Sequence, residues 1–269
     1  MKLCINHSTL AQADVDVFLD AAASAGFEGV ELRIEKLRPY MATNHSLEQV
    51  RGLLKDHELT SVCLNSFEDF SHVPSADFEF SLLRAREFSR ICRDTDCDLF
   101  VACPSPAPKN VSKNEALAVT ADRLDRIAKI AANESVRVAF EFVYGRSAST
   151  LEDAITVLER TRSPSVGLVV DTFHFYVGQS VLTSLDRLPL DRLWVVHFND
   201  AERGPLDQMT DQKRLLPGSG IIQLREFAER LKERSWNGWL SVEMFRPEYC
   251  TRDPYEFAKE SMKALASFL

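Results

Sequence analysis

The sequence contains few of the features that mark several classes of protein. Six cysteines are scattered over 269 residues without a Cys-x-x-Cys pair, which argues against a zinc clip and against a disulfide-stapled fold. No uncharged apolar run reaches the 18 residues of a membrane span, and the polar stretch after the first seven residues lacks the apolar core of a signal peptide. We therefore expect a protein of the reducing cytoplasm.

Positive charge and glycine are also in short supply. The 32 basic residues face 40 acidic ones, a net charge of −8, which disfavours attraction to nucleic acid or to anionic membranes. Among the 10 glycines, the one local cluster is Pro217-Gly218-Ser219-Gly220, which is too short for a P-loop, and residues 6–9 lack the glycine-rich turn of a dinucleotide-binding fold. The expected partner is a small molecule, with no nucleic acid and no membrane.

Short β-branched runs alternate with longer amphipathic segments along the whole chain. The apolar runs are typical of buried parallel strands, and each is followed by a helical pattern. Eight such units predict a closed (β/α)8 TIM barrel in a single domain, residues 1–269, rather than a doubly wound sheet. The predicted strands are residues 3–5, 29–32, 61–64, 99–102, 136–142, 166–170, 193–198 and 239–242.

Capping signals mark the ends of several predicted helices. An apolar stripe from Val15 ends at Gly26, which suits the residue after a helix C-terminus. Ser46 with Gln49, and Ser149 with Glu152, have the spacing of a capping box. Asp253 followed by a proline predicts the start of the last helix.

Ionisable residues end four successive predicted strands of the second half. Catalytic groups of such barrels lie at the carboxyl ends of the strands, so these side chains should converge on one rim. Converging carboxylates need counter-charges or a metal. Three carboxylates and one imidazole suit a single divalent ion, Mn²⁺, Mg²⁺, Co²⁺ or Zn²⁺, with open positions for a substrate. The predicted ligands are Glu141, Asp171, His197 and Glu243.

Several of these segments resemble the xylose-isomerase-like TIM barrel superfamily, which also includes apurinic endonucleases. The segments are 140–142, 170–174, 196–200, 217–220 and 242–249. The opening strand, the Glu-x-Arg of the second strand, the Asp-x-Phe-His and the Phe-Arg-Pro-Glu-Tyr segments are similar to those of inosose isomerases, and the similarity covers essentially the whole chain. The resemblance implies the same four metal ligands, with Glu141 and Glu243 also acting as the acid and base pair.

Five further residues are predicted to contact the substrate. By the resemblance, His174 reaches a substrate hydroxyl, and Arg203 matches an arginine that ketose 3-epimerases place on their substrate, although the inosose isomerases do not share it. Glu31 is a candidate polyol contact or half of a buried ion pair. His7 contacts the substrate or is structural, and Arg246 orients Glu243 or lies at a helix entry or subunit contact.

The residues favour an isomerase that moves a ketone to the neighbouring hydroxyl carbon of an inosose through an enediolate. The same groups could serve a dehydratase of an inosose or of 3-dehydroshikimate, or a ketose 3-epimerase. A nuclease is disfavoured because its metal cluster needs several histidines on the early strands. A non-catalytic barrel is disfavoured because all four ligands are present. The barrel is also expected to form a homo-oligomer.

Overall fold

The computed structural model describes residues 1–269. Eight parallel strands hydrogen-bond in the cyclic order β1-β10-β7-β6-β5-β4-β3-β2, which is a closed barrel and confirms the predicted fold. Each predicted strand corresponds to one barrel strand within a few residues. The strands are β1 (Lys2–Asn6), β2 (Gly29–Arg33), β3 (Thr60–Glu68), β4 (Leu99–Cys103), β5 (Arg137–Glu141), β6 (Val166–Asp171), β7 (Leu193–His197) and β10 (Trp239–Val242).

Nine α-helices lie between and after the strands. No helix combines the length and the apolar character needed to cross a membrane. The helices are α1 (Val15–Ala25), α2 (Ile34–Ala42), α3 (Leu47–Asp56), α4 (Ser75–Asp94), α5 (Lys113–Ala132), α6 (Leu151–Arg160), α7 (Thr172–Val177), α8 (Leu224–Glu233) and α9 (Pro254–Ala266). Short 3-10 helices are η1 (His7–Leu10), η2 (Leu182–Arg187), η3 (Leu190–Arg192), η4 (Leu206–Gln208), η5 (Asp211–Lys213) and η6 (Pro247–Thr251).

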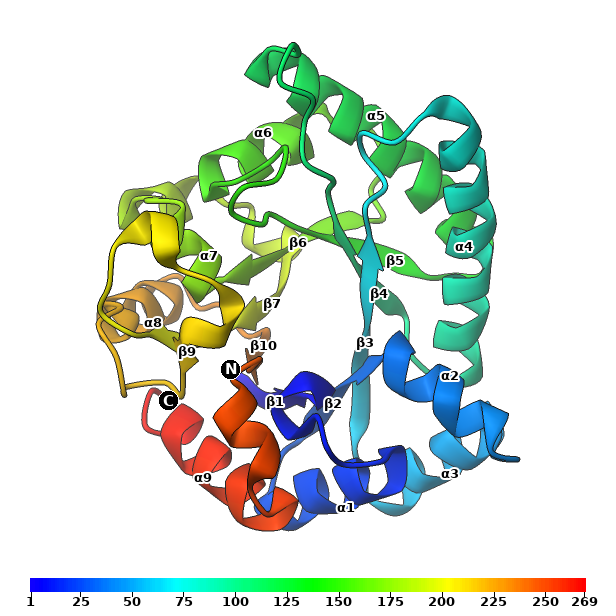
Figure 1. Ribbon diagram of the computed structural model, residues 1–269, viewed down its shortest axis with the longest axis vertical. Coiled ribbons are helices and arrows are strands. Elements are labelled where there is room, and N and C mark those ends of the chain that lie inside the picture. The colour runs from blue at the N-terminus through cyan, green and yellow to red at the C-terminus, as the bar shows by residue number, and fades with distance from the viewer. The chain divides into compact units, whose positions relative to one another are not determined.

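The chain forms two compact units. The first comprises Met1–Val62, Asp171–Phe173 and Val195–Leu269. Within it, β1 pairs with both β2 and β10, and α1 packs beside α9 (Figure 1). The paired strands are almost wholly buried, as expected for parallel strands covered by helices.

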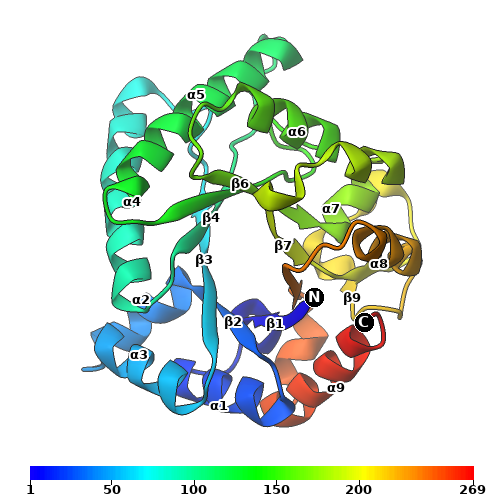
Figure 2. The ribbon, with the colours of Figure 1, turned by 180° about the vertical axis from the view of Figure 1, so that it is seen from behind.

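The second unit comprises Cys63–Val170 and His174–Trp194. Here β4 pairs with β3 and β5, and α5 packs between α4 and α6, as the view from behind shows (Figure 2). Its core includes an aromatic cluster in which Phe67 and Phe100 pack against the ring of Phe88 from α4. Because β5 pairs with β6 through Glu141 and Val169, Glu141 lies two residues before the level at which β6 ends.

Most of the predicted helix ends are confirmed. Gly26 closes α1 with a φ of 88°, Ser46 caps α3 in a complete capping box, and Asp253 caps α9. The box predicted at Ser149 is wrong by one residue, since the cap of α6 is Thr150, which accepts from the backbone N–H of Asp153. Asp153 also accepts from the backbone of Ser149, so a carboxylate one residue later takes the place assigned to Glu152.

A two-stranded antiparallel sheet that the sequence did not predict follows β7. It pairs β8 (Asp200–Ala201) with β9 (Arg214–Leu215) through Asp200 with Leu215 and Ala201 with Arg214. Each strand has only two residues, too few for a recognisable alternation of apolar and polar side chains. This small sheet brings a loop arginine back beside the end of β7.

Candidate metal centre

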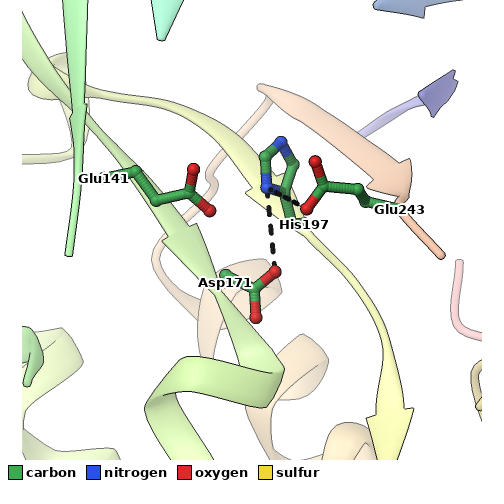
Figure 3. A group of neighbouring side chains, drawn as sticks. All are labelled: Glu141, Asp171, His197 and Glu243. Atoms are coloured by element: carbon green, nitrogen blue, oxygen red, sulfur yellow. Dashed lines mark ion pairs between the residues drawn. The ribbon is translucent and has the colours of Figure 1, made fainter. Parts of the chain in front are cut away.

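The four predicted ligands occupy the carboxyl ends of their strands. Glu141, Asp171 and His197 are the last residues of β5, β6 and β7, and Glu243 directly follows β10. All four side chains are buried, and each offers one ligand atom within 4.8 Å of the others (Figure 3). The structure therefore brings together the residues that the sequence singled out.

His197 is oriented by a second, fully buried carboxylate. Its Nε2 lies 3.1 Å from Oε2 of Glu31, at the end of β2. Because an ionised carboxylate only accepts hydrogen bonds, Nε2 carries a proton. Nδ1 lies 3.1 Å from Glu243 Oε2 and 3.7 Å from Asp171 Oδ2. The ring thus presents Nδ1 to the cluster.

Glu243 is surrounded by hydrogen-bond donors. Its Oε1 accepts from Asn6 Nδ2 and from a guanidinium nitrogen of Arg33, both at 3.2 Å. Its Oε2 accepts from Arg214 at 3.0 Å. Burial by itself raises the pKa of this carboxyl, but His197, Arg214 and Arg33 outweigh burial and hold the pKa well below its usual range. Glu243 is therefore ionised at neutral pH.

Asp171 shares its arginine with Glu243. Asp171 Oδ2 accepts from Arg214 at 2.6 Å and from Asn199 Nδ2 at 3.1 Å. Asn199 also accepts the backbone N–H of Glu243 through its Oδ1 at 3.0 Å, so one amide contacts two of the predicted ligands. Burial lowers the pKa of Arg214, but Asp171, Asp211 and Glu243 together raise it above its ordinary value. The guanidinium is a permanent cation of the site.

Glu141 has a different neighbour. The thiol of Cys103, at the end of β4, donates to Glu141 Oε2 at 3.4 Å. A thiol is a weak and uncharged donor, so this contact stabilises the ionised carboxylate less than an arginine does.

Charge and donor chemistry both fit a divalent cation. The buried carboxylates of Glu31, Glu141, Asp171 and Glu243 outnumber the buried guanidiniums of Arg33 and Arg214, which leaves two negative charges when His197 is neutral. His197 Nδ1 also faces two carboxylate oxygens, an arrangement that needs a proton or a metal ion among these atoms. Two negative charges and these donors match Mn²⁺, Mg²⁺, Co²⁺ or Zn²⁺.

The remaining predicted contacts lie in different surroundings. His174 is buried on α7, one turn after Asp171. His7 is also buried, but its Nε2 contacts the carbonyl of Ala13 at 3.0 Å and its ring stacks on Phe18 at 4.0 Å between centroids. These contacts favour the structural alternative for His7 over substrate binding.

The two predicted arginines are both less buried than Arg214. Arg203 is exposed in the loop after β8. Arg246 is partly exposed and pairs with Glu202 and with Glu248. Neither position supplies a charge to the cluster in the way that Arg214 does.

Sequence reasoning missed Arg214, Asn199 and the contact between Glu31 and His197. Arg214 lies in a long connection without periodicity, where no local pattern marks an arginine as buried. One signal was present: converging carboxylates need counter-charges, and Arg214 stands close before the glycine cluster at 217–220. That signal names no particular arginine.

Known proteins resemble this chain over its full length. An inosose isomerase of Bacillus velezensis is 29% identical over 273 residues, covering 99% of this chain and 98% of that protein. A 3-dehydroshikimate dehydratase of Pseudomonas aeruginosa is 26% identical over 92% of this chain, which corresponds to 38% of its own length.

A solved structure and a family pattern also resemble this chain. A crystal structure of the IolI protein with a bound zinc atom superposes with a TM-score of 0.94 at 26% identity, covering 100% of this chain and 99% of the other. The pattern of the family described as xylose isomerase-like TIM barrel matches residues 19–268. The chain belongs to the xylose isomerase-like TIM barrel family.

Proposed function

We propose that this protein is a divalent-metal-dependent isomerase of cyclic polyol ketones, with an inosose such as 2-keto-myo-inositol as its substrate. The buried cluster of Glu141, Asp171, His197 and Glu243 carries the proposal. The full-length similarity to an inosose isomerase and the zinc atom in the IolI structure support it. The cluster residues are the proposed metal ligands.

The reaction moves a carbonyl to the neighbouring hydroxyl carbon. One base removes the proton from that carbon, and one acid delivers a proton to the former carbonyl carbon, while the hydroxyl proton passes from the first oxygen to the former carbonyl oxygen. A bound divalent cation supplies Lewis acidity for the negative charge that develops on the two substrate oxygens. Glu141 and Glu243 are the proposed acid and base pair.

Glu243 is built to stay ionised, because Arg33 and Arg214 stabilise its charge. Glu141 accepts a hydrogen bond from the thiol of Cys103. His174 is the proposed contact to a substrate hydroxyl, and Glu31 orients His197 rather than binding the substrate.

Dehydration is the second candidate, because a dehydratase is among the relatives and the same enediolate can expel a β-hydroxyl. A ketose 3-epimerase is less favoured, since Arg203, the residue that suggested it, is exposed in a loop.

Proton NMR in D₂O with the Mn²⁺-loaded protein tests the proposal. With 2-keto-myo-inositol we expect deuterium next to the carbonyl and a new inosose. Glu243→Gln and Glu141→Gln should each reduce the rate by at least about 100-fold, because each removes a proton-transfer group. Glu248→Gln, which alters an exposed carboxylate, is the matched control.

The same spectra separate the alternatives. An unsaturated product identifies a dehydratase, and exchange only in a parallel sample of fructose or tagatose identifies an epimerase. Absence of exchange in both samples with metal bound contradicts the proposed substrate class.

A further inference from the structure

The glycine cluster at residues 217–220 is bound by a single carboxylate. Asp200 Oδ2 accepts the backbone N–H groups of Gly218 at 3.2 Å and of Gly220 at 2.8 Å, and its Oδ1 accepts that of Ile222 at 2.9 Å. We call Asp200 with residues 217–222 the Asp200 clasp. The glycines thus bind a carboxylate of their own chain.

Close packing explains the second glycine of the clasp. A Cβ at Gly220 would lie 2.2 Å from the carbonyl oxygen of Ala201 and 2.5 Å from Asp200 Oδ1. Both distances are shorter than the contacts that Cβ atoms make in proteins, so a larger residue would force the loop away from β8. Gly218 has a φ of 84°, which other residues adopt at a cost.

The Asp200 clasp and the β8–β9 pairing hold both ends of one loop. Ala201 pairs with Arg214, Glu202 donates its backbone N–H to Lys213 at 3.0 Å, and Ile221 donates to Ala201 at 3.1 Å. The backbone of Arg214 is therefore fixed against the residues that directly follow His197 in sequence.

The side chain of Arg214 spans from this loop to two predicted ligands. One guanidinium nitrogen contacts Asp171 Oδ2 at 2.6 Å and Glu243 Oε2 at 3.0 Å. The other two nitrogens donate to Asp211 on η5 at 3.0 and 2.7 Å. The rings of Phe173 and Phe245 each lie 5.1 Å from the guanidinium carbon. The oxygens it contacts are those nearest to His197 Nδ1.

We propose that Arg214 is a positioning residue, held by the Asp200 clasp, that sets the two carboxylates of Asp171 and Glu243 in the arrangement that binds the cation. The cation itself rests on the proposed function. The loop contributes to the site without supplying a ligand, because the fixed backbone of Arg214 determines where its guanidinium reaches. In this proposal the glycine cluster has a role: it closes the loop that carries Arg214.

Titration with Mn²⁺ by calorimetry, without substrate, tests the proposal. Arg214→Lys keeps the positive charge, so repulsion of the metal is nearly unchanged, but it loses the planar fork that joins the carboxylates to Asp211. Asp200→Asn replaces one accepting oxygen of the clasp with a donor, and Asp200 is not one of the proposed ligands. We expect each variant to weaken Mn²⁺ binding about 10-fold or more. Asp207→Asn, an exposed change on the same loop, is the control and should bind as the wild type does.

A second measurement does not depend on the metal. In metal-free protein labelled with ¹⁵N-arginine, the buried side-chain N–H groups of Arg214 should exchange slowly with solvent, and Arg214→Lys identifies their signals. Asp200→Asn should accelerate this exchange at least about 10-fold, whereas Asp207→Asn should not. Guanidinium at millimolar concentration should restore Mn²⁺ binding to Arg214→Ala, which a purely structural role would not allow.

Two results overturn the inference. One is Mn²⁺ affinity within twofold of the wild type in both Arg214→Lys and Asp200→Asn. The other is unchanged exchange of the Arg214 N–H groups in Asp200→Asn. If the wild type binds no Mn²⁺, the proposed metal dependence fails, and the exchange measurement alone decides whether the Asp200 clasp positions Arg214.

Discussion

Glu31 shows how one distance assigns a role to a residue. Its carboxylate faces His197 Nε2 at 3.1 Å and is fully buried. A ligand histidine usually donates its second ring N–H to such a partner, which fixes both the tautomer and the ring. The sequence left a polyol contact and a buried pair as alternatives, and the observed contact favours the pair.

We expect Glu31→Gln to weaken Mn²⁺ binding about 10-fold or more, because the neutral amide holds the imidazole tautomer less firmly. Calorimetric titration measures the affinity, and ¹⁵N NMR of histidine shows whether Nε2 carries the proton in the wild type. Glu28→Gln, an exposed change directly before the same strand, is the control. A raised KM for the inosose with unchanged Mn²⁺ affinity would instead identify Glu31 as a substrate contact.

His7 makes stability depend on pH. Burial is the main cause that lowers the pKa of its imidazole from 6.5 to about 3, against the raising effect of the Ala13 carbonyl. The unfolded chain therefore binds a proton between these values that the folded chain does not. The resulting penalty is absent above about pH 6.5 and grows as the pH falls towards 3, by up to about 1.4 kcal/mol per unit.

Urea unfolding of the metal-free protein between pH 4 and 8 measures this effect. His7→Gln should flatten the acid side of the curve relative to the wild type, whatever its effect at pH 8. His57→Gln changes a histidine that is not buried and should leave the slope as it is. Equal slopes for His7→Gln and the wild type would refute the assignment.

Single residues in strands were easier to predict than single residues in loops. Glu141, Asp171 and His197 each end an apolar run, so strand periodicity and barrel geometry together place them on one rim. Arg214 and Asn199 belong to connections, where the conformation depends on distant contacts such as those of Asp200. Their positions could not be predicted because no local pattern encodes those contacts.

At the scale of elements, two glycines separate backbone strain from helix propensity. Gly26 ends α1 with a φ of 88°, whereas Gly52 lies within α3, and an added Cβ meets nothing within 4 Å at either position. Gly26→Ala should lower the free energy of unfolding by about 1 kcal/mol through left-handed strain. Gly52→Ala should raise it by about 0.5–1 kcal/mol through helix propensity.

Chemical denaturation of the two variants checks this pair, and each serves as the control for the other, since both add one methyl group in open space. Changes of the same sign would contradict the assignment of strain to Gly26.

Helix ends were predictable where the cap is a short local pattern, as at Ser46 and Asp253. At α6, the adjacent residues Ser149 and Thr150 can both cap a helix. Thr150 is the one used, and its N3 partner Asp153 also accepts the backbone N–H of Ser149. The sheet of β8 and β9 could not be predicted, because its register depends on Asp200 and the glycine cluster.

At the scale of the whole molecule, eight strands and helices in strict alternation were enough to predict the barrel, since right-handed crossovers leave few other arrangements. The residue numbers of the four proposed ligands followed from that topology. The balance of buried charge did not, because it depends on Arg33 and Arg214 as well as on the carboxylates. One domain over residues 1–269 and a homo-oligomer stay predictions.

The excess of buried carboxylates over buried guanidiniums would link stability to the proposed cation. Binding to the folded chain alone stabilises it by about 2.7 kcal/mol when Mn²⁺ is 100 times its Kd, which raises Tm by roughly 5–10 °C. Glu141→Gln removes one of these charges and one ligand. Its Tm in EDTA should therefore equal or exceed that of the wild type, and Mn²⁺ should no longer raise it appreciably. Glu248→Gln, exposed and outside the cluster, should respond to Mn²⁺ as the wild type does. Scanning calorimetry with EDTA and with Mn²⁺ gives both comparisons, and a wild-type Tm that is the same in the two conditions would show that the cluster holds its charges without a metal.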